Sequence, residues 1–300
     1  MAKKLISIIG STGIGKTSLA IKLAKYYKTE IISCDSRQFF KEMKIGTAVP
    51  SDEELAEIPH HFIGNLSVED YYSIGQYEID ALKKLKEIFE KNDFAVLVGG
   101  SGMYEKAVVE GLNNLPEANE ENQQKLMKIW QDEGLEKLKQ ILENLDSDYF
   151  KIVDKDNPRR LLRAIDIIWQ TGKTYMENIK AHQPKRDFET IRILLDAPRE
   201  IIYDRINKRV DVMIKNGLLE EVKNLEKFKN LVPLQTVGYK ELFNYFNGEY
   251  NLDFAIEEIK KNSRRYAKRQ TTWNKKLEHV SILPHNYSWE DVLKILPLKC

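Results

Sequence analysis

Eight residues near the N-terminus have the types and the spacing of a phosphate-binding loop. They are Gly10, Ser11, Thr12, Gly13, Ile14, Gly15, Lys16 and Thr17, and they match the pattern GxxxxGK[ST]. In such a loop, backbone N–H groups surround phosphate oxygens, while a helix N-terminus and a lysine supply positive charge. The pattern predicts a diphosphate ligand, with Thr17 binding Mg²⁺ through its hydroxyl. The alternative is an accidental glycine turn.

A second candidate for chemistry is the carboxylate of Asp35. P-loop ATPases and GTPases usually carry a magnesium-shell carboxylate at the end of a later core strand. Here the apolar run 94–98 ends in Gly99, Gly100 and Ser101, which disfavours a motor or a switch protein. Asp35 instead ends the predicted strand 30–35, at the strand end where parallel sheets carry their chemistry. It could accept a proton from a nucleophile, or it could simply cap the following turn.

The elements that must position these residues alternate between strands and helices. Predicted strands cover 5–9, 30–35, 94–98 and 190–196, and predicted helices cover 16–27, 77–91 and 201–217. Near-continuous apolar strands separated by helices indicate a parallel sheet that is covered on both faces. We therefore predict an α/β fold in which a P-loop NTPase-like parallel sheet is flanked by helices.

The strand pattern is interrupted in the middle of the chain. From about 115 to 183, helical periodicity with many charges replaces it. We expect 115–183 to form an inserted helical subdomain. Residues 1–114 and 184–300 then form the P-loop core, with basic helices in its C-terminal part.

Two basic segments point to a polyanion, although the net charge of the chain is only +1. The stretch 260–276 lacks acidic residues and contains Lys260, Lys261, Arg264, Arg265, Lys268, Arg269, Lys275 and Lys276. Many of them recur at intervals of four, with Tyr266 and Trp273 interleaved, a pattern that suits single-stranded nucleic acid. The second segment, 157–163, displays arginines from the start of a predicted helix. Ordinary solvated helix faces are the alternative for both.

The bulk properties exclude several other classes of protein. The apolar runs are strand-sized, no signal peptide is visible, and the chain has 2 cysteines, too few for a disulfide framework. We expect a monomer in the cytoplasm without a membrane anchor. The pair His60-His61 is too compact to grip one metal ion, and we interpret it as a structural or substrate-lining turn.

Taken together, these motifs resemble the tRNA dimethylallyltransferase family over nearly the whole chain. The resemblance rests on the phosphate loop and on the segments 35–38, 45–48, 59–61, 98–100, 159–164, 209–213, 238–239 and 267–273. It implies transfer of a dimethylallyl group from dimethylallyl diphosphate to N6 of adenosine 37, next to the anticodon of tRNA, with release of diphosphate. Enzymes that react with a base commonly flip it out of the stack.

The resemblance also implies roles for individual residues. Asp35 would be the general base, Thr12 its hydrogen-bonding partner, and Arg209 a cation that faces the diphosphate together with Lys16 and Mg²⁺. The implied contacts with the tRNA anticodon stem-loop are Asp35, Ser36, Arg37, Gln38, Ser101, Gln123, Arg159, Arg160, Leu161, Leu162, Arg163, Arg264, Arg265, Lys268 and Arg269. Ser101, Gln123, Arg159 and Val49 depart from the residues that are common in the family.

Two other functions remain open from the residues alone. One is a small-molecule kinase that binds ATP in the phosphate loop, and the other is a nucleotide-gated RNA-binding protein. The basic segment 260–276 disfavours the kinase, and the absent carboxylate after Val98 disfavours the gated protein.

Overall fold

The computed structural model describes residues 2–113, 115–180 and 185–297. The chain divides into two compact units, Met1–Val109 with Arg186–Cys300, and Glu110–Lys185. We describe each unit by itself.

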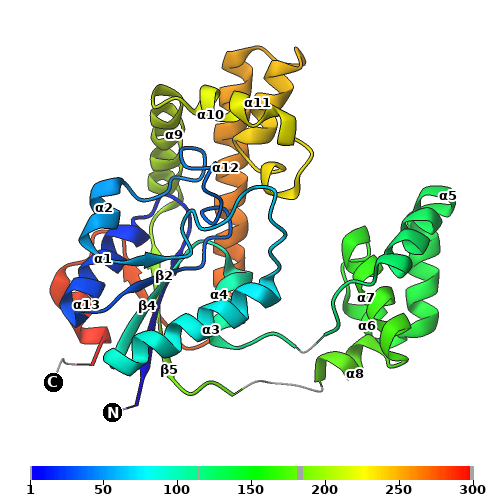
Figure 1. Ribbon diagram of the computed structural model, residues 1–300, viewed down its shortest axis with the longest axis horizontal. Helices are drawn as coiled ribbons and strands as arrows, with labels where there is room; N and C mark the ends of the chain where they lie inside the picture. The colour runs from blue at the N-terminus through cyan, green and yellow to red at the C-terminus, as the bar shows by residue number, and fades with distance from the viewer. Residues whose placement is uncertain (1, 114, 181–184, 298–300) are drawn as a thin grey trace. The chain divides into compact units, whose positions relative to one another are not determined.

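The first unit is built on a sheet of six parallel strands (Figure 1). The strands are β1 Lys4–Gly10, β2 Ile31–Ser33, β3 His60–His61, β4 Phe94–Val98, β5 Glu189–Asp196 and β6 Val280–Pro284. Their order across the sheet is β3-β2-β4-β1-β5-β6, which confirms the predicted parallel α/β fold. The two edge strands were not predicted. Instead of a turn, His60-His61 forms β3, which has only two residues, and β6 ends in a proline.

Helices cover both faces of this sheet. The helices of this unit are α1 Lys16–Tyr27, α2 Asp52–Glu57, α3 Ile74–Lys91, α4 Gly102–Val109, α9 Arg199–Lys215, α10 Leu218–Asn224, α11 Tyr239–Phe246, α12 Leu252–Asn274 and α13 Trp289–Ile295, of which α10 and α11 pack against other helices. Two short 3-10 helices, η1 Glu226–Phe228 and η2 Val232–Leu234, lie between α10 and α11. Among the described residues, no helix combines the length and the apolar character needed to cross a bilayer.

Alternation along the strands sends side chains into two separate cores. On β1, Leu5 packs into the core that contains residues of α3, whereas Ile6 and Ile8 pack into the core that contains residues of α1. All three side chains are 0% exposed, as expected for a parallel sheet buried on both faces. Because both faces are covered, the carboxyl ends of the strands are where loops can build a site.

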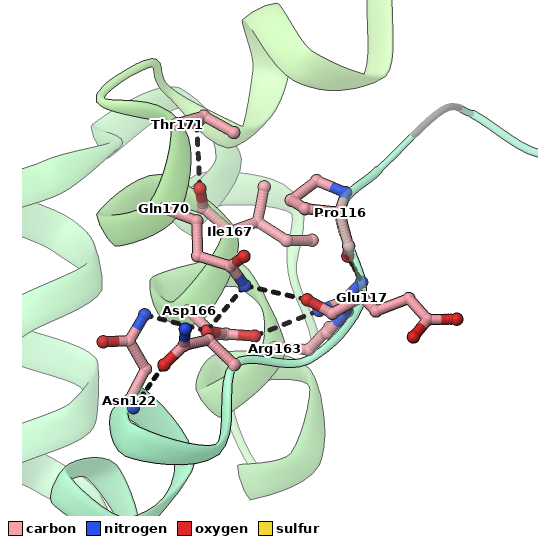
Figure 2. Close-up of polar contacts among 9 residues, drawn as sticks. Pro116, Glu117, Asn122, Arg163, Asp166, Ile167, Gln170 and Thr171 are labelled. Carbon is pink, nitrogen blue, oxygen red and sulfur yellow. Dashed lines mark hydrogen bonds and ion pairs between the residues drawn. The ribbon is translucent and has the colours of Figure 1, made fainter.

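The second unit consists of helices around its own core. It contains α5 Glu120–Leu145, α6 Ser147–Ile152, α7 Pro158–Thr171 and α8 Tyr175–Lys180. Figure 2 shows its buried polar centre, in which the carboxylate of Asp166 accepts hydrogen bonds from Asn122, Arg163 and Gln170. Arg163 and Gln170 also donate to the carbonyls of Pro116 and Glu117. The buried Asp166 carboxylate thus links α7 to α5. Its partners Arg163 and Gln170 link the same centre to residues 116–117.

Candidate active site

The phosphate loop connects β1 to α1, as its sequence predicts. Gly15 has φ 105°, a left-handed conformation that strains other residues, and a Cβ on Gly10 would lie 2.8 Å from the Leu195 carbonyl oxygen. The Lys16 Nζ donates to the carbonyls of Gly10 at 3.0 Å and Ser11 at 2.9 Å, so the ammonium lies within the loop. Burial lowers the pKa of Lys16 to about 8, against the raising effect of Asp35.

A cavity of about 70 Å³ adjoins this loop. Four separate parts of the first unit contribute to its wall: Thr12 from the loop, Asp35 from the end of β2, Arg209 from α9, and Tyr266 and Gln270 from α12. The three residues that the resemblance implied for catalysis are therefore brought together, from positions far apart in the sequence. Basic and acidic groups face one cavity, which is an arrangement suited to acid–base chemistry beside an anion.

Asp35 serves two structural purposes at once. Its Oδ1 accepts a hydrogen bond from the Arg37 N–H at 3.2 Å, and its carbonyl oxygen accepts one from the Gln38 N–H at 2.9 Å. The capping role considered from the sequence is therefore present. The residue is nevertheless only half-buried and lines the cavity, so its carboxylate remains accessible to a ligand.

Arg209 lies beside the phosphate loop. Its Nη1 donates to the Thr12 Oγ1 at 3.4 Å, although much of the residue stays open to solvent. Loss of water around the guanidinium lowers the pKa of Arg209, and nearby Asp35 raises it. An arginine remains charged under such a shift, and a planar cation at this place can neutralise a phosphate.

Gln270 is a member of the site to which the sequence assigned no role. Its Oε1 accepts from the Thr12 N–H at 2.9 Å, and its Nε2 donates to the Gly100 carbonyl at 2.7 Å. The residue is 8% exposed. The only sequence signal was its position within the segment 267–273, because a partner 258 positions away leaves no local pattern.

Residues after Asp35 form the next part of the wall. The Arg37 guanidinium lies 4.2 Å from the centre of the Tyr266 ring, a cation–π contact. The Ser36 and Ser101 hydroxyl oxygens are 3.1 Å apart. The Gln38 side-chain amide donates to the carbonyl of Ala48 at 2.9 Å, so it holds a neighbouring loop in place. Of the expected tRNA contacts here, Gln38 is thus already committed to internal hydrogen bonding.

The predicted basic surface on α12 is smaller than its sequence suggested. Lys260 pairs with Asp211 and Glu257, at 2.8 Å and 3.0 Å, and Lys261 pairs with Glu258. Arg264 donates to the Asn207 side chain at 2.6 Å. Arg265, Lys268 and Arg269 are exposed and form no ion pair within the described part of the chain. We define these three residues as the α12 cationic face.

In the second unit, the predicted tRNA segment 159–163 divides into exposed, buried and ion-paired residues. Arg159 and Arg160 are exposed on the first turn of α7. Leu161 and Leu162 are 0% and 6% exposed, so their side chains belong to the helical core, and any contact of these two positions with tRNA stays a prediction. The apolar face of the helix requires them inside. Arg163 is held by Asp166, and Gln123 lies in the first turn of α5.

The parallel sheet and the loop between β1 and α1 define a protein with a P-loop-like α/β fold. Residues 38–277 match the model of the IPP transferase family. The chain belongs to this family, which confirms the resemblance found in the sequence. A tRNA dimethylallyltransferase from Christiangramia forsetii is 54% identical over 92% of this chain and 91% of the relative, and one from Flavobacterium psychrophilum is 48% identical over 98% of both.

Solved structures agree with this assignment. A full-length tRNA isopentenylpyrophosphate transferase from Bacillus halodurans superimposes with a TM-score of 0.72 at 34% identity, covering 98% of this chain and 93% of that one. A eukaryotic dimethylallyltransferase, described as acting on tRNA, superimposes with a TM-score of 0.81 at 26% identity, covering 95% of this chain and 74% of that one.

Proposed function

We propose that this protein transfers a dimethylallyl group from dimethylallyl diphosphate to N6 of adenosine 37, next to the anticodon of tRNA, and releases diphosphate. Membership of the family supports the proposal. The observation that carries it is the shared cavity of Thr12, Asp35 and Arg209, because it unites a phosphate-binding loop, a base and a cation. In this reaction the allylic C–O bond breaks with its electron pair leaving on diphosphate, and a C–N bond forms.

Each of these residues has one part in the proposed reaction. The carboxylate of Asp35 receives the proton that the N6 amine loses. Lys16 and the loop N–H groups bind the diphosphate, and Arg209 neutralises the charge that develops on it as it departs. The adenine must leave its base stack to enter the cavity.

The residues present are compatible with Mg²⁺. No cluster of three or more His, Cys, Asp or Glu residues suited to a metal ion occurs in the described ranges. Mg²⁺ commonly binds through one or two protein groups together with substrate phosphates. Thr17, half-buried at the start of α1, would hold the ion, which supplies charge neutralisation to the bound diphosphate.

Two surfaces are proposed to hold the tRNA. In the first unit these are Ser36, Arg37, Ser101 and the α12 cationic face, which adjoin or continue from the cavity wall. In the second unit they are Gln123, Arg159 and Arg160. Exposed arginine and lysine suit phosphate contacts, which set the strength and the salt dependence of RNA binding.

Incubation of the purified protein with Mg²⁺, labelled dimethylallyl diphosphate and unmodified tRNA tests the proposal. We expect label in the tRNA, and none in a matched tRNA that carries guanosine at position 37. The kinase alternative predicts instead that ATP is consumed without tRNA and that no prenyl group is transferred. That outcome would replace the proposal.

A further inference from the structure

A second cavity, of about 320 Å³, borders the candidate active site. Its wall comes from the loop that follows Asp35, from the segment 70–72, from Tyr104 on α4, and from residues around η2. Arg37 lines both cavities. We call the second cavity the aromatic pocket, because Phe39, Phe40, Tyr71, Tyr72 and Tyr104 contribute to it.

Two very exposed apolar side chains lie at this pocket. Tyr71 is 87% exposed and Val232 is 85% exposed, the largest values among the exposed large hydrophobic residues of the described chain. They belong to different segments, yet both line the aromatic pocket. Tyr71 makes no hydrogen bond or ring contact with another described residue, so the fold does not use its ring. Apolar groups that gather in this way beside a site usually mark a binding surface.

Aromatic side chains that line the pocket are held by contacts with their neighbours. The Phe39 ring stacks on Tyr77 at 5.2 Å and meets Tyr72 edge-on at 5.7 Å. The Tyr72 hydroxyl is held by Asp80 at 2.8 Å.

We propose that the aromatic pocket holds a second nucleobase of the tRNA, one directly adjacent to the acceptor adenosine. This inference rests on the proposed function. Extrusion of the acceptor base removes the stacking of its neighbours, and an aromatic ring such as Tyr71 replaces that stacking for any base. The occupant lies next to the acceptor because Arg37 is shared by both cavities and Ser36 follows Asp35.

The test uses anticodon stem-loop RNA that carries 2-aminopurine on one side or the other of the acceptor position. The fluorescence of this base falls when it stacks. We expect binding to quench it at one of the two positions in the wild-type protein and in Tyr71→Phe, but not in Tyr71→Ala. We also expect Tyr71→Ala to weaken RNA affinity roughly tenfold to hundredfold. Ile79→Ala is the control, since Ile79 is 63% exposed on α3 and lines none of the described pockets.

An abasic nucleotide at the quenched position completes the test. It should weaken binding to the wild-type protein by the same factor as Tyr71→Ala and should not weaken binding to Tyr71→Ala any further. Full additivity of the two losses overturns the inference, as does quenching at neither position or equal quenching in wild type and Tyr71→Ala. These readouts need no catalysis, so absence of prenyl transfer defeats only the proposed function.

Discussion

The Gln270 side chain accepts a hydrogen bond from the Thr12 N–H at 2.9 Å and donates one to the Gly100 carbonyl at 2.7 Å. A single residue of α12 therefore joins the phosphate loop to the turn that follows β4. The same helix carries Tyr266 and the α12 cationic face. Gln270 thus connects the proposed RNA-binding helix α12 to the proposed donor site by hydrogen bonds.

Replacing Gln270 with Leu should disturb both the loop and the donor site. Two hydrogen bonds disappear and a partly buried N–H and C=O lose their partner, which should lower the free energy of unfolding by about 1–3 kcal/mol. We also expect KM for dimethylallyl diphosphate to rise about tenfold, because the Thr12 backbone loses its support. Thr272→Ala, at an exposed position of the same helix, should change neither quantity. Lowered stability with an unchanged KM would limit Gln270 to a structural role.

Asp35→Asn should remove turnover while preserving RNA binding. The amide keeps an oxygen that can accept from the Arg37 N–H but cannot take the N6 proton, so kcat should fall by about 10²- to 10⁴-fold. Single-turnover kinetics measures this loss, and a filter-binding titration checks that the Kd for tRNA stays constant. Wild-type turnover in the variant would show that another group accepts the proton.

Use of the donor should depend on pH through Lys16. Burial lowers its pKa to about 8, so the free enzyme loses this cation as the pH rises through 8. We therefore expect kcat/KM for dimethylallyl diphosphate to be constant below that pH and to fall about tenfold per pH unit above it. In Lys16→Arg the guanidinium stays charged, and any remaining activity should not decline in this range. A wild-type profile that is flat from pH 7 to 10 would contradict the assignment.

The α12 cationic face should determine much of the salt dependence of tRNA binding. Changing Arg265, Lys268 and Arg269 together to Gln should reduce the slope of log Kd against log salt by about 0.7–0.9 for each RNA phosphate that is no longer neutralised. The matched control changes Lys260 and Lys261 to Gln, because these lysines already pair with acidic groups of the protein. An equal change of slope in both variants would show that the ion pairs of Lys260 and Lys261 do not prevent these lysines from binding RNA phosphates.

Substitutions of two neighbouring residues at the start of α7 should affect different properties, namely stability and tRNA binding. Leu161 is 0% exposed in the helical core, so Leu161→Ala should lower the free energy of unfolding of the second unit by about 2–5 kcal/mol. Arg160 is exposed, so Arg160→Ala should change this quantity by less than about 0.5 kcal/mol and should instead weaken tRNA binding. Thermal denaturation and RNA titration of both variants provide the comparison. An equal loss of free energy of unfolding in the two variants would show that Arg160 also contributes to the stability of the second unit.

Local sequence patterns were sufficient for the central part of the sheet. The predicted strand 94–98 coincides with β4, and 5–9 lies within β1. The helix predicted at 77–91 begins earlier, at Ile74, because the Ser73 side chain caps it by accepting from the Gln76 N–H at 3.1 Å. The edge strand β6 escaped prediction since it pairs with β5 alone, and Ser281 and Pro284 interrupt the apolar run that marks the central strands.

The sequence by itself determined the phosphate loop, the parallel fold and the family, because these depend on residue types at short spacings. Only the tertiary structure decided which side chains meet: Gln270 with Thr12, Arg37 with Tyr266, and Lys260 with Asp211. It also placed Leu161 inside the helical core and Arg160 outside it. Such contacts depend on the path of the chain between distant positions. The sequence therefore shows which residues are charged, whereas the spatial neighbours of each residue decide whether its charge is already paired within the protein or is available to a ligand.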